Sequence, residues 1–392
     1  MSLRLRSGGS RSPPDEHRVT TSFWQAGVAP GPHYPPLGGD VSADVAIVGG
    51  GIAGVACAAA LVRDGLSVIV LERTDLASGA SGRNAGFVLS GVAESYVAAC
   101  RRYGSERAGR VFRATVTNRA LFRRIIADET ISCDDHWDGS DQLAADDAEW
   151  DDLVAGASAV AQLGAAVELD PPTRRATVSG DGCLDPVLFV RGLASAAAAR
   201  GARIHTGTLV TGVAPGVVRT TSGTVTAGTV VLCTGAYTRH LAPARIRPVR
   251  GQMLATAPVA PGRFPRPVYA GRGYRYWRQA ANGSVLVGGW RDLAVETEIG
   301  EDDGTSALIQ DALEEWLRAE GIAAPVTHRW GGTMDFSHDG LPYVGRRSDG
   351  LFLCGGFTGH GNGFALVAAD ILAALARTGR HPDADLFDPE RA

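Results

Sequence analysis

The 392-residue sequence contains no lysine, and all 38 of its basic residues are arginine. This absence excludes a Schiff-base lysine, a phosphate-binding P-loop lysine and a lysine general base. Acidic residues outnumber the basic ones, which gives a net charge of −4. A nucleic-acid-binding protein would need a basic surface, so we expect no nucleic-acid partner.

Long apolar runs are also missing. No segment approaches the roughly 18 consecutive apolar residues that a membrane span requires, so we expect no membrane partner. The first 19 residues are polar and arginine-rich without an apolar centre, which is atypical of a secretory signal. We therefore expect a cytoplasmic protein.

Cysteine pairs with metal-ligand or redox spacing are absent as well. The six cysteines are scattered, with no C-x-x-C and no Cys/His cluster: Cys57, Cys100, Cys133, Cys183, Cys233 and Cys354. In a chain of this length the pattern predicts buried, reduced thiols rather than a disulfide framework or a metal site.

Hydrophobic residues make up 45% of the chain and charged residues 20%, enough apolar material for a large core. Apolar runs and turn residues predict strands at 44–48, 66–71, 203–213, 228–233 and 351–354, and a hairpin of 274–279 with 284–289. Helices are expected at 53–64, 194–200 and 364–377 and over much of 92–165. This alternation favours an α/β fold with a second layered domain.

The most informative motif is the glycine-rich run at 49–54. It contains G-x-G-x-x-G at Gly49, Gly51 and Gly54, after a predicted strand and before a predicted helix. Gly49 permits a tight turn, Gly51 lets the backbone approach a pyrophosphate, and Gly54 lets helix and strand pack closely. Glu72 ends the next predicted strand, where its carboxylate can accept the ribose hydroxyls of a bound dinucleotide.

Two further segments favour FAD over a nicotinamide dinucleotide. A loop of small residues, 74–91, directly follows Glu72 and can wrap a pyrophosphate. A glycine-rich turn, 355–364, opens the last predicted helix, and its N–H groups could hold the negative charge of a reduced flavin.

These segments resemble the D-amino-acid-oxidase-type family of FAD-dependent oxidoreductases, which includes glycine oxidase, sarcosine oxidase and γ-glutamylputrescine oxidoreductase. The resemblance runs from about residue 22 to 391. It includes GGGIAG (49–54), ASGASGRNAGF (77–87), CTGAYT (233–238), PVRGQ (248–252), Trp330, DGLP (339–342) and GFTGHGNGF (356–364).

The family's fold implies a Rossmann-like FAD-binding domain of the GR2 type and an α+β substrate domain built on an antiparallel sheet. We assign 41–92, 166–243 and 326–380 to the first domain and 93–165 with 244–325 to the second. Residues 1–40 are expected to form a flexible arm, in which Ser22–Trp24 can dock onto the body, and 381–392 a C-terminal tail.

The resemblance also implies which residues contact a non-covalently bound FAD. The expected contacts are Gly49, Gly51, Ile52, Ala53, Gly54, Glu72, Arg73, Ala80, Ser81, Arg83, Asn84, Ala85, Gly86, Phe87, Val210, Thr234, Gly235, Gly359, His360, Gly361, Asn362, Gly363, Phe364 and Ala365. For Arg83 and Asn84, a role in stabilising the loop is the alternative.

Two departures from the family pattern affect the substrate and the cofactor linkage. Met334 occupies the position where amino-acid oxidases of the family carry an arginine for the substrate carboxylate, and a thioether cannot form a bidentate ion pair. An amine, a secondary amine or an acid anchored elsewhere is therefore expected. Residues 331–345 contain no cysteine and 78–87 no histidine, so covalent attachment of FAD is not expected.

Four further residues are candidates on the substrate side. Strand alternation places Tyr274, Tyr276 and Arg278 on one face, where two aromatic rings and a guanidinium would suit an amine with a carboxylate tail. Ordinary sheet packing is the alternative. His360 lies in the glycine-rich turn, where a backbone role competes with a catalytic one; Tyr274, Tyr276 and His360 are the catalytic candidates.

We therefore expect an FAD-dependent enzyme that oxidises a C–N bond of an amine or amino acid to an imine, with oxygen as acceptor and hydrogen peroxide as product. A dehydrogenase that passes electrons to a quinone or protein carrier is the alternative. A non-catalytic flavin-binding assembly protein is the second alternative.

Overall fold

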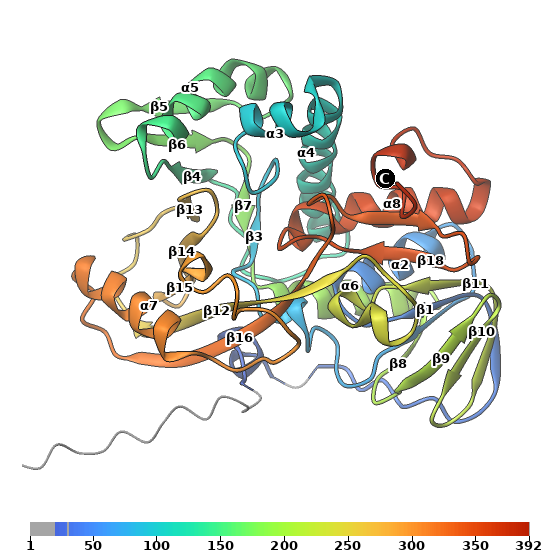
Figure 1. Ribbon diagram of the computed structural model, residues 1–392. Coiled ribbons are helices and arrows are strands. Elements are labelled where there is room, and N and C mark those ends of the chain that lie inside the picture. Colours follow the sequence, from blue (N-terminus) through green and yellow to red (C-terminus); the bar gives the residue numbers. More distant parts are fainter. Residues whose placement is uncertain (1–19, 30, 392) are drawn as a thin grey trace, which may run out of the picture.

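The computed structural model describes residues 20–29 and 31–391. Two eight-stranded sheets dominate this part of the chain, one carrying the glycine-rich turn and one lying beside it (Figure 1). Within the described residues, no helix is both long and apolar enough to cross a bilayer.

The first sheet has the order β17-β18-β11-β1-β2-β8, with β9 and β10 attached through β11. Its central neighbours β18, β11, β1, β2 and β8 run parallel to one another. The strands are β1 (Val41–Val48), β2 (Val68–Leu71), β8 (Arg203–His205), β9 (Val210–Ala214), β10 (Val217–Thr220), β11 (Thr224–Leu232), β17 (Tyr343–Arg346) and β18 (Phe352–Gly355). Because parallel strands end at the same edge, the loops after β1, β2 and β11 meet there.

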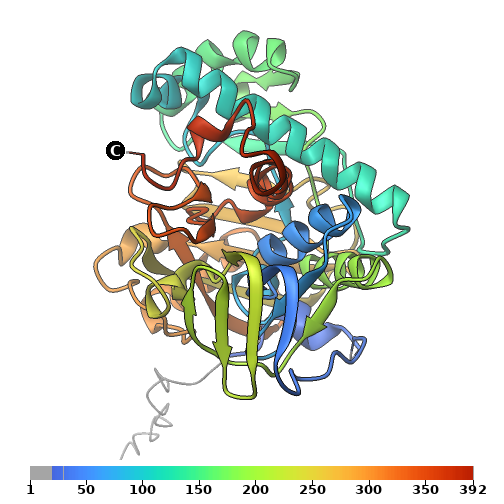
Figure 2. The same cartoon turned by 90° about the vertical axis from the view of Figure 1, so that its right-hand side faces the viewer.

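Both faces of this sheet are covered, which explains why its central strands are apolar throughout. On β1, Val45 and Ile47 belong to the core beneath the helices, whereas Ala46 and Val48 belong to the core on the opposite face. Helices α2 (Ile52–Arg63), α6 (Pro186–Ala199) and α8 (Gly361–Thr378) contribute to the first core, and α2 packs against both others (Figure 2).

The second sheet has the order β16-β12-β15-β14-β13-β4-β6-β5 and is antiparallel except between β13 and β4. Helix α7 (Ala307–Ala319) covers one face by packing Ile309, Leu313 and Leu317 on Leu254 and Val287. The strands are β4 (Ser140–Leu143), β5 (Val167–Asp170), β6 (Arg175–Val178), β12 (Arg247–Pro258), β13 (Val268–Ala270), β14 (Arg275–Gln279), β15 (Ser284–Gly289) and β16 (Val326–Phe336).

Helices α3, α4 and α5 cap the β4–β6 end of this sheet, and α4 also packs against α8 (Figure 1). The short pair β3–β7 is antiparallel. The remaining elements are α1 (Phe23–Gly27), α3 (Tyr96–Tyr103), α4 (Ser105–Asp128), α5 (Asp147–Gln162), β3 (Phe87–Val88), β7 (Gly182–Cys183) and the 3₁₀ turns η1 (Ala80–Gly82), η2 (Pro171–Thr173), η3 (Gly235–His240), η4 (Arg291–Leu293) and η5 (Ala384–Leu386).

Most predicted elements form near their expected positions, and the 274–289 hairpin is confirmed as β14–β15. The single strand predicted over 203–213 is wrong: β8 pairs with β2, whereas β9 pairs with β10. The helical region 92–165 is interrupted by β4. The helix predicted at 194–200 begins at Pro186, because the Asp185 carboxylate caps the N–H groups of Val187 and Leu188.

The two sheets do not follow the predicted domain boundaries at two places. Strands β5 and β6 fall within 166–243 but pair in the second sheet, and β16 falls within 326–380 but pairs with β12. Both segments were assigned to the FAD-binding domain. The division of the chain into two domains stays a prediction.

The expectation of a flexible arm over 1–40 is wrong for the half that the structure describes; residues 1–19 and 30 lie outside the described residues. Ser22 caps α1 in a capping box with Gln25, and Ser22 and Trp24 are buried. The Trp24 indole Nε1 donates to the carbonyl of Asn84 at 2.7 Å. The docking of Ser22–Trp24 onto the body is thereby confirmed.

Replacing Trp24 by phenylalanine is expected to lower the free energy of unfolding by about 1–2 kcal/mol, because the ring still packs but the hydrogen bond to Asn84 is lost. Urea unfolding of the wild type and the variant measures this change. An unchanged midpoint and slope would show that the indole donor contributes nothing to stability.

Candidate functional site

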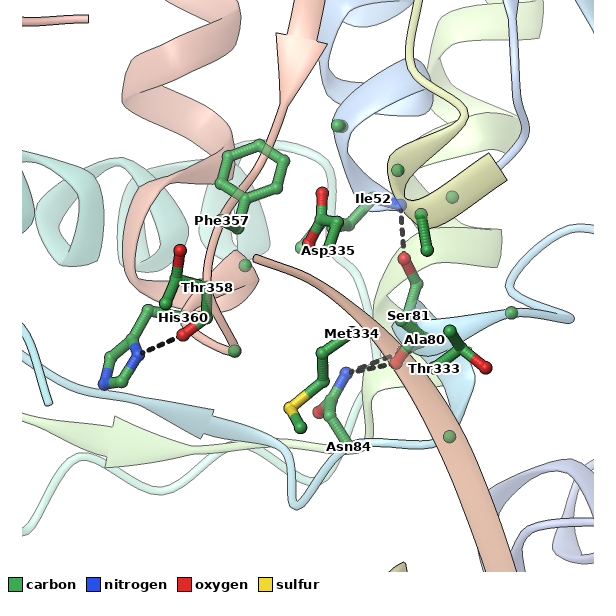
Figure 3. A pocket seen from close by; sticks show the side chains of 18 of the residues that line it. Ile52, Ala80, Ser81, Asn84, Thr333, Met334, Asp335, Phe357, Thr358 and His360 are labelled. Atoms are coloured by element: carbon green, nitrogen blue, oxygen red, sulfur yellow. Dashed lines mark hydrogen bonds between the residues drawn. The ribbon is translucent and has the colours of Figure 1, made fainter. Parts of the chain in front are cut away.

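A cavity of about 790 Å³ begins at the carboxyl edge of the first sheet and extends to the second sheet. Its wall includes residues that follow β1, β2 and β11, the η1 loop, the start of α8, and residues from β14 and β16. The volume falls within the range of about 300–1,000 Å³ that is usual for ligand sites. Figure 3 shows part of this wall.

The three motif glycines each occupy a position where a side chain would not fit. Gly49 has φ +114°, and a Cβ on it would lie 2.5 Å from the Cys233 carbonyl oxygen. A Cβ on Gly51 would lie 2.8 Å from Ser81 Oγ, and one on Gly54 only 1.9 Å from the Gly49 carbonyl oxygen. The turn is therefore a bare backbone cradle at the start of α2, which suits a pyrophosphate.

The first helical N–H group of α2 points at the η1 loop. Ile52 N donates to Ser81 Oγ at 2.9 Å (Figure 3). This N–H lies at the positive end of the α2 dipole, so an anion at this place would be stabilised.

Glu72 lies directly after β2 and lines the cavity, as expected of the ribose-binding acid. Its carboxylate accepts from Gly50 N at 2.7 Å and from Thr74 N at 2.9 Å, which fixes it beside the glycine turn. The neighbouring Arg73 guanidinium stacks over the Tyr237 ring at 4.2 Å.

Asn84 joins two walls of the cavity. Its amide nitrogen donates to the carbonyls of Ala80 and Ser81 (Figure 3). Its Oδ1 accepts from Gly86 N at 2.7 Å. The same oxygen accepts from Asn362 Nδ2 at 3.2 Å, which links the loop to the first turn of α8.

Replacing Asn84 by alanine removes these bonds and leaves the η1 loop and α8 unlinked. We expect FAD affinity to fall about tenfold, the equivalent of one or two lost hydrogen bonds. Titration of the FAD-free variant with FAD, followed by quenching of flavin fluorescence, measures the change; an affinity equal to that of the wild type would contradict it.

Arg83 is buried and holds the loop rather than presenting its charge to the cavity. Its guanidinium donates to the carbonyls of Ser78, Thr20 and Gly331. The alternative role in stabilising the loop is therefore the one that the geometry favours.

The glycine-rich turn before α8 reaches the cavity with its backbone. Gly359 has φ +81°, and His360 through Phe364 line the wall. His360 Nδ1 lies 3.2 Å from the Thr358 carbonyl, and its Nε2 lies 3.4 Å from the Tyr269 hydroxyl. Burial lowers the pKa of His360, so the ring is neutral near pH 7 and does not supply a positive charge.

Tyr274, Tyr276 and Met334 line the cavity, and their contact with a substrate stays a prediction. Met334 lies beside Gly359, where a Cβ on that glycine would meet its sulfur at 3.3 Å. Burial raises the pKa of Tyr276 to about 12, so its hydroxyl stays protonated at neutral pH and can donate a hydrogen bond.

The prediction that Arg278 binds substrate is wrong. The side chain is 1% exposed, and its Nη1 donates to the carbonyls of Leu184, at 2.8 Å, and Ala85. The guanidinium lies over the Trp24 ring, and the residue does not line the cavity. The alternation of side chains along the strand correctly placed Arg278 on the same face of β14 as Tyr276. The part of that face around Arg278, however, is covered by α1 and residues 84–87.

The other predicted cofactor residues lie at the cavity wall with three exceptions. Gly54, Gly86 and Ala365 are not part of the wall. Gly54 and Gly86 permit close packing instead, since a Cβ on Gly86 would lie 2.1 Å from the Leu184 carbonyl oxygen. The predicted residues that line it are Gly49, Gly51, Ile52, Ala53, Glu72, Arg73, Ala80, Ser81, Arg83, Asn84, Ala85, Phe87, Val210, Thr234, Gly235, Gly359, His360, Gly361, Asn362, Gly363 and Phe364.

Several cavity residues were missed by the sequence analysis. They are Tyr269, Arg272, Arg291, Thr333, Asp335 and Phe336. The strand that carries Met334 could have indicated its neighbours Asp335 and Phe336. Arg291 follows the predicted hairpin, whose register Arg275–Gly289 brings it beside Tyr274.

The cysteines are not all scattered in space, which corrects the sequence analysis. The Sγ atoms of Cys57, Cys233 and Cys354 lie within 4.8 Å of one another, beneath the glycine turn. The hydrogen bonds among the thiols act in both directions, and together with burial they leave the pKa of each thiol well above its usual value. The three side chains therefore pack as neutral thiols.

Comparison with known proteins places the chain among flavin enzymes. The family model DAO, described as FAD dependent oxidoreductase, matches residues 44–375. The chain is 27% identical over 394 residues to a probable oxidoreductase OrdL of Rhizobium meliloti (strain 1021), covering 93% of this chain and 90% of that protein. It is 25% identical over 402 residues to gamma-glutamylputrescine oxidoreductase of Escherichia coli (strain K12), covering 94% and 91%.

The fold of the chain is also similar to that of solved structures. A crystal structure of glycine oxidase from Geobacillus kaustophilus superimposes with a TM-score of 0.77 at 23% sequence identity, over 90% of this chain and 99% of that one. The expected α/β fold with a Rossmann-like nucleotide-binding part is confirmed.

Proposed function

Because the chain belongs to the DAO family of FAD-dependent oxidoreductases, we propose that it oxidises a C–N bond of an amine or amino acid to an imine, with oxygen as the electron acceptor and hydrogen peroxide as the product. The relatives whose names state a substrate, γ-glutamylputrescine and glycine, support an amine. The observation that carries the proposal is that one cavity joins the glycine turn, the start of α8 and the Tyr274–Tyr276 wall.

The residues present fit FAD, held non-covalently as is typical of the family. The glycine turn, the positive end of the α2 dipole and Ser81 would hold the pyrophosphate, Glu72 the ribose, and the first N–H groups of α8 the polar edge of the ring. Bound FAD supplies a two-electron acceptor that no side chain can provide.

The chain's own residues bind and orient the substrate amine. Tyr276 keeps its proton and can donate a hydrogen bond, and Tyr274 adds a second hydroxyl to the same wall. The neutral His360 ring, between Thr358 and Tyr269, shapes the wall without adding charge. An amine substrate would therefore meet a largely apolar wall that favours its uncharged form.

Anaerobic mixing tests the proposal. The FAD-loaded protein is mixed under nitrogen with amines, N-methyl amines, and D- and L-amino acids, and bleaching of the flavin absorbance identifies a substrate. Admission of oxygen should then restore the absorbance rapidly with one hydrogen peroxide per flavin. Bleaching followed by slow reoxidation would instead favour a dehydrogenase, and no bleaching with any amine would reject the proposal.

A further inference from the structure

Arg291 is held at the cavity wall by an unusual turn at the end of β15. Gly289 has φ +110°, and Trp290 adopts the left-handed conformation with φ +56°, which is costly for a tryptophan. Trp290 N donates to the Tyr274 carbonyl at 2.7 Å, and the Trp290 ring is buried in the α7 core. This turn directs the next residue, Arg291, at the cavity.

Two aromatic rings receive the Arg291 guanidinium. Its central carbon lies 5.3 Å from the centroid of the Tyr274 ring and 5.3 Å from that of Phe336. Cation–π contacts of this kind fix the position of a guanidinium without using its N–H donors. The five donors of the fork therefore remain available to a ligand.

Arg291 differs in this respect from the other arginines near the substrate end. Arg272 pairs with Asp146 at 2.9 Å, and Arg102 pairs with Glu94 at 3.5 Å. Within residues 20–29 and 31–391, no carboxylate lies within 4 Å of the Arg291 guanidinium, and none of its N–H groups is hydrogen-bonded. A cation on an apolar wall without an acidic partner is suited to a carboxylate ligand.

The position of this cation constrains the ligand. Phe336, on which it stacks, lies two residues beyond Met334 along β16. Two residues of strand correspond to about 7 Å. Side chains two residues apart on a strand point to the same face, so a carboxylate on Arg291 would bind farther along that face than the place beside Gly359, which Met334 fills with an uncharged thioether.

We propose that Arg291 anchors a carboxylate of the substrate, and that this carboxylate is separated from the oxidised C–N bond by several bonds. The substrate class is then an ω-amino acid or another amine with a carboxylate tail, rather than a simple α-amino acid. The inference rests on the proposed function for the amine, but the binding of the carboxylate can be tested without turnover.

The first experiment uses carboxylates that cannot be oxidised at nitrogen. FAD-loaded protein is titrated with acetate, propanoate, butanoate, pentanoate and hexanoate and with the corresponding amides, and binding is read from the change in the flavin absorption spectrum. We expect the longer carboxylates to bind at least about tenfold more tightly than their amides, and Arg291→Met to remove that preference.

Two variants control for charge and folding. Arg291→Lys keeps the charge but not the two-pronged geometry, so we expect an intermediate affinity for pentanoate. Arg329 lies in β16 but pairs with Glu314 and does not line the cavity, so Arg329→Met should bind carboxylates as the wild type does. Equal binding of carboxylates and amides by the wild type would overturn the inference, as would unchanged carboxylate binding by Arg291→Met.

The second experiment separates this inference from the proposed function. Glycine, β-alanine, 4-aminobutanoate, 5-aminopentanoate and 6-aminohexanoate are compared in the anaerobic bleaching assay. We expect the longer members to be preferred by the wild type and the preference to disappear in Arg291→Met. If no amine bleaches the flavin but Arg291 still selects carboxylates over amides, the proposed function fails and the anion site stands; if amines bleach it equally with and without a carboxylate, the inference fails and the function stands.

Discussion

A Gly54→Ala variant is expected to lose its bound FAD. The added methyl group would lie 1.9 Å from the Gly49 carbonyl oxygen, far inside contact distance. The methyl carbon is attached directly to Cα and the oxygen belongs to the backbone, so neither atom can rotate away. The start of α2 must therefore move away from the glycine turn, and the cradle for the pyrophosphate opens. A strain of about 3 kcal/mol in this cradle would weaken FAD binding about a hundredfold.

Equilibrium dialysis against FAD, followed by flavin absorbance of the protein, measures this loss. Gly212→Ala is the matched control, because a Cβ at Gly212 meets no atom within 4 Å and the residue lies in β9. The control should retain FAD as the wild type does. Tight FAD binding by Gly54→Ala would show that the turn can accommodate a side chain and that the close packing of helix and turn is not needed.

The glycine turn could be predicted because its function is encoded locally. Gly49 has a positive φ, and a Cβ on Gly54 would meet the Gly49 carbonyl oxygen, so both of these requirements arise within the turn itself. Gly51 is the exception, because the atom that its Cβ would meet belongs to Ser81 in the η1 loop. The local encoding holds again for Glu72, which ends the neighbouring strand. Patterns of this kind depend on the chain's immediate geometry, so they are visible in the sequence.

The errors involve contacts between segments far apart in the chain. Alternation predicted the face on which Arg278 lies, but not that Trp24 and the Ala85 carbonyl cover it. Likewise, Cys57, Cys233 and Cys354 have no metal-like spacing, yet they meet where α2, β11 and β18 converge. The depth of a side chain depends on what packs over it, and no local pattern contains that information.

Arg291 is a cavity residue that the sequence did not reveal, because its position also depends on contacts between distant segments. The hairpin was predicted, but the direction of the chain after it depends on the left-handed Trp290, whose ring is held by α7. An arginine just beyond a predicted strand is usually solvated. Only the assembled β14–β15 hairpin and β16 place its guanidinium beside Tyr274 and Phe336.

The second large expected effect concerns Asp335, which should make the free energy of unfolding depend on pH. This carboxyl group is buried in the cavity wall, and burial raises its pKa to about 6, against the opposing effect of the hydrogen bond that Oδ2 accepts from Gly356 N at 2.6 Å. The folded protein therefore binds this proton more tightly than the unfolded chain, whose aspartate has a pKa near 3.9. The free energy of unfolding should fall as the pH rises from about 4 through about 6, and then stay lower by about 3 kcal/mol.

Asp335→Asn keeps an oxygen that can accept from Gly356 N but carries no charge. At pH 8 the variant should therefore be more stable than the wild type by up to about 3 kcal/mol, and the difference should vanish near pH 4. Urea unfolding of the FAD-free proteins between pH 4 and pH 8 measures the difference without a contribution from cofactor affinity.

Asp339→Asn is the matched control with the opposite sign. Burial would raise the pKa of Asp339, but its hydrogen bonds to Arg391 outweigh burial and lower it. The charged form of Asp339 therefore stabilises the fold, and this contribution is lost as the pH falls through the lowered pKa, so Asp339→Asn should be less stable than the wild type at pH 8. If both variants shift the free energy of unfolding at pH 8 in the same direction, the charge on Asp335 and the charge on Asp339 do not have opposite effects on stability. Burial at the cavity wall would then not govern the titration of Asp335.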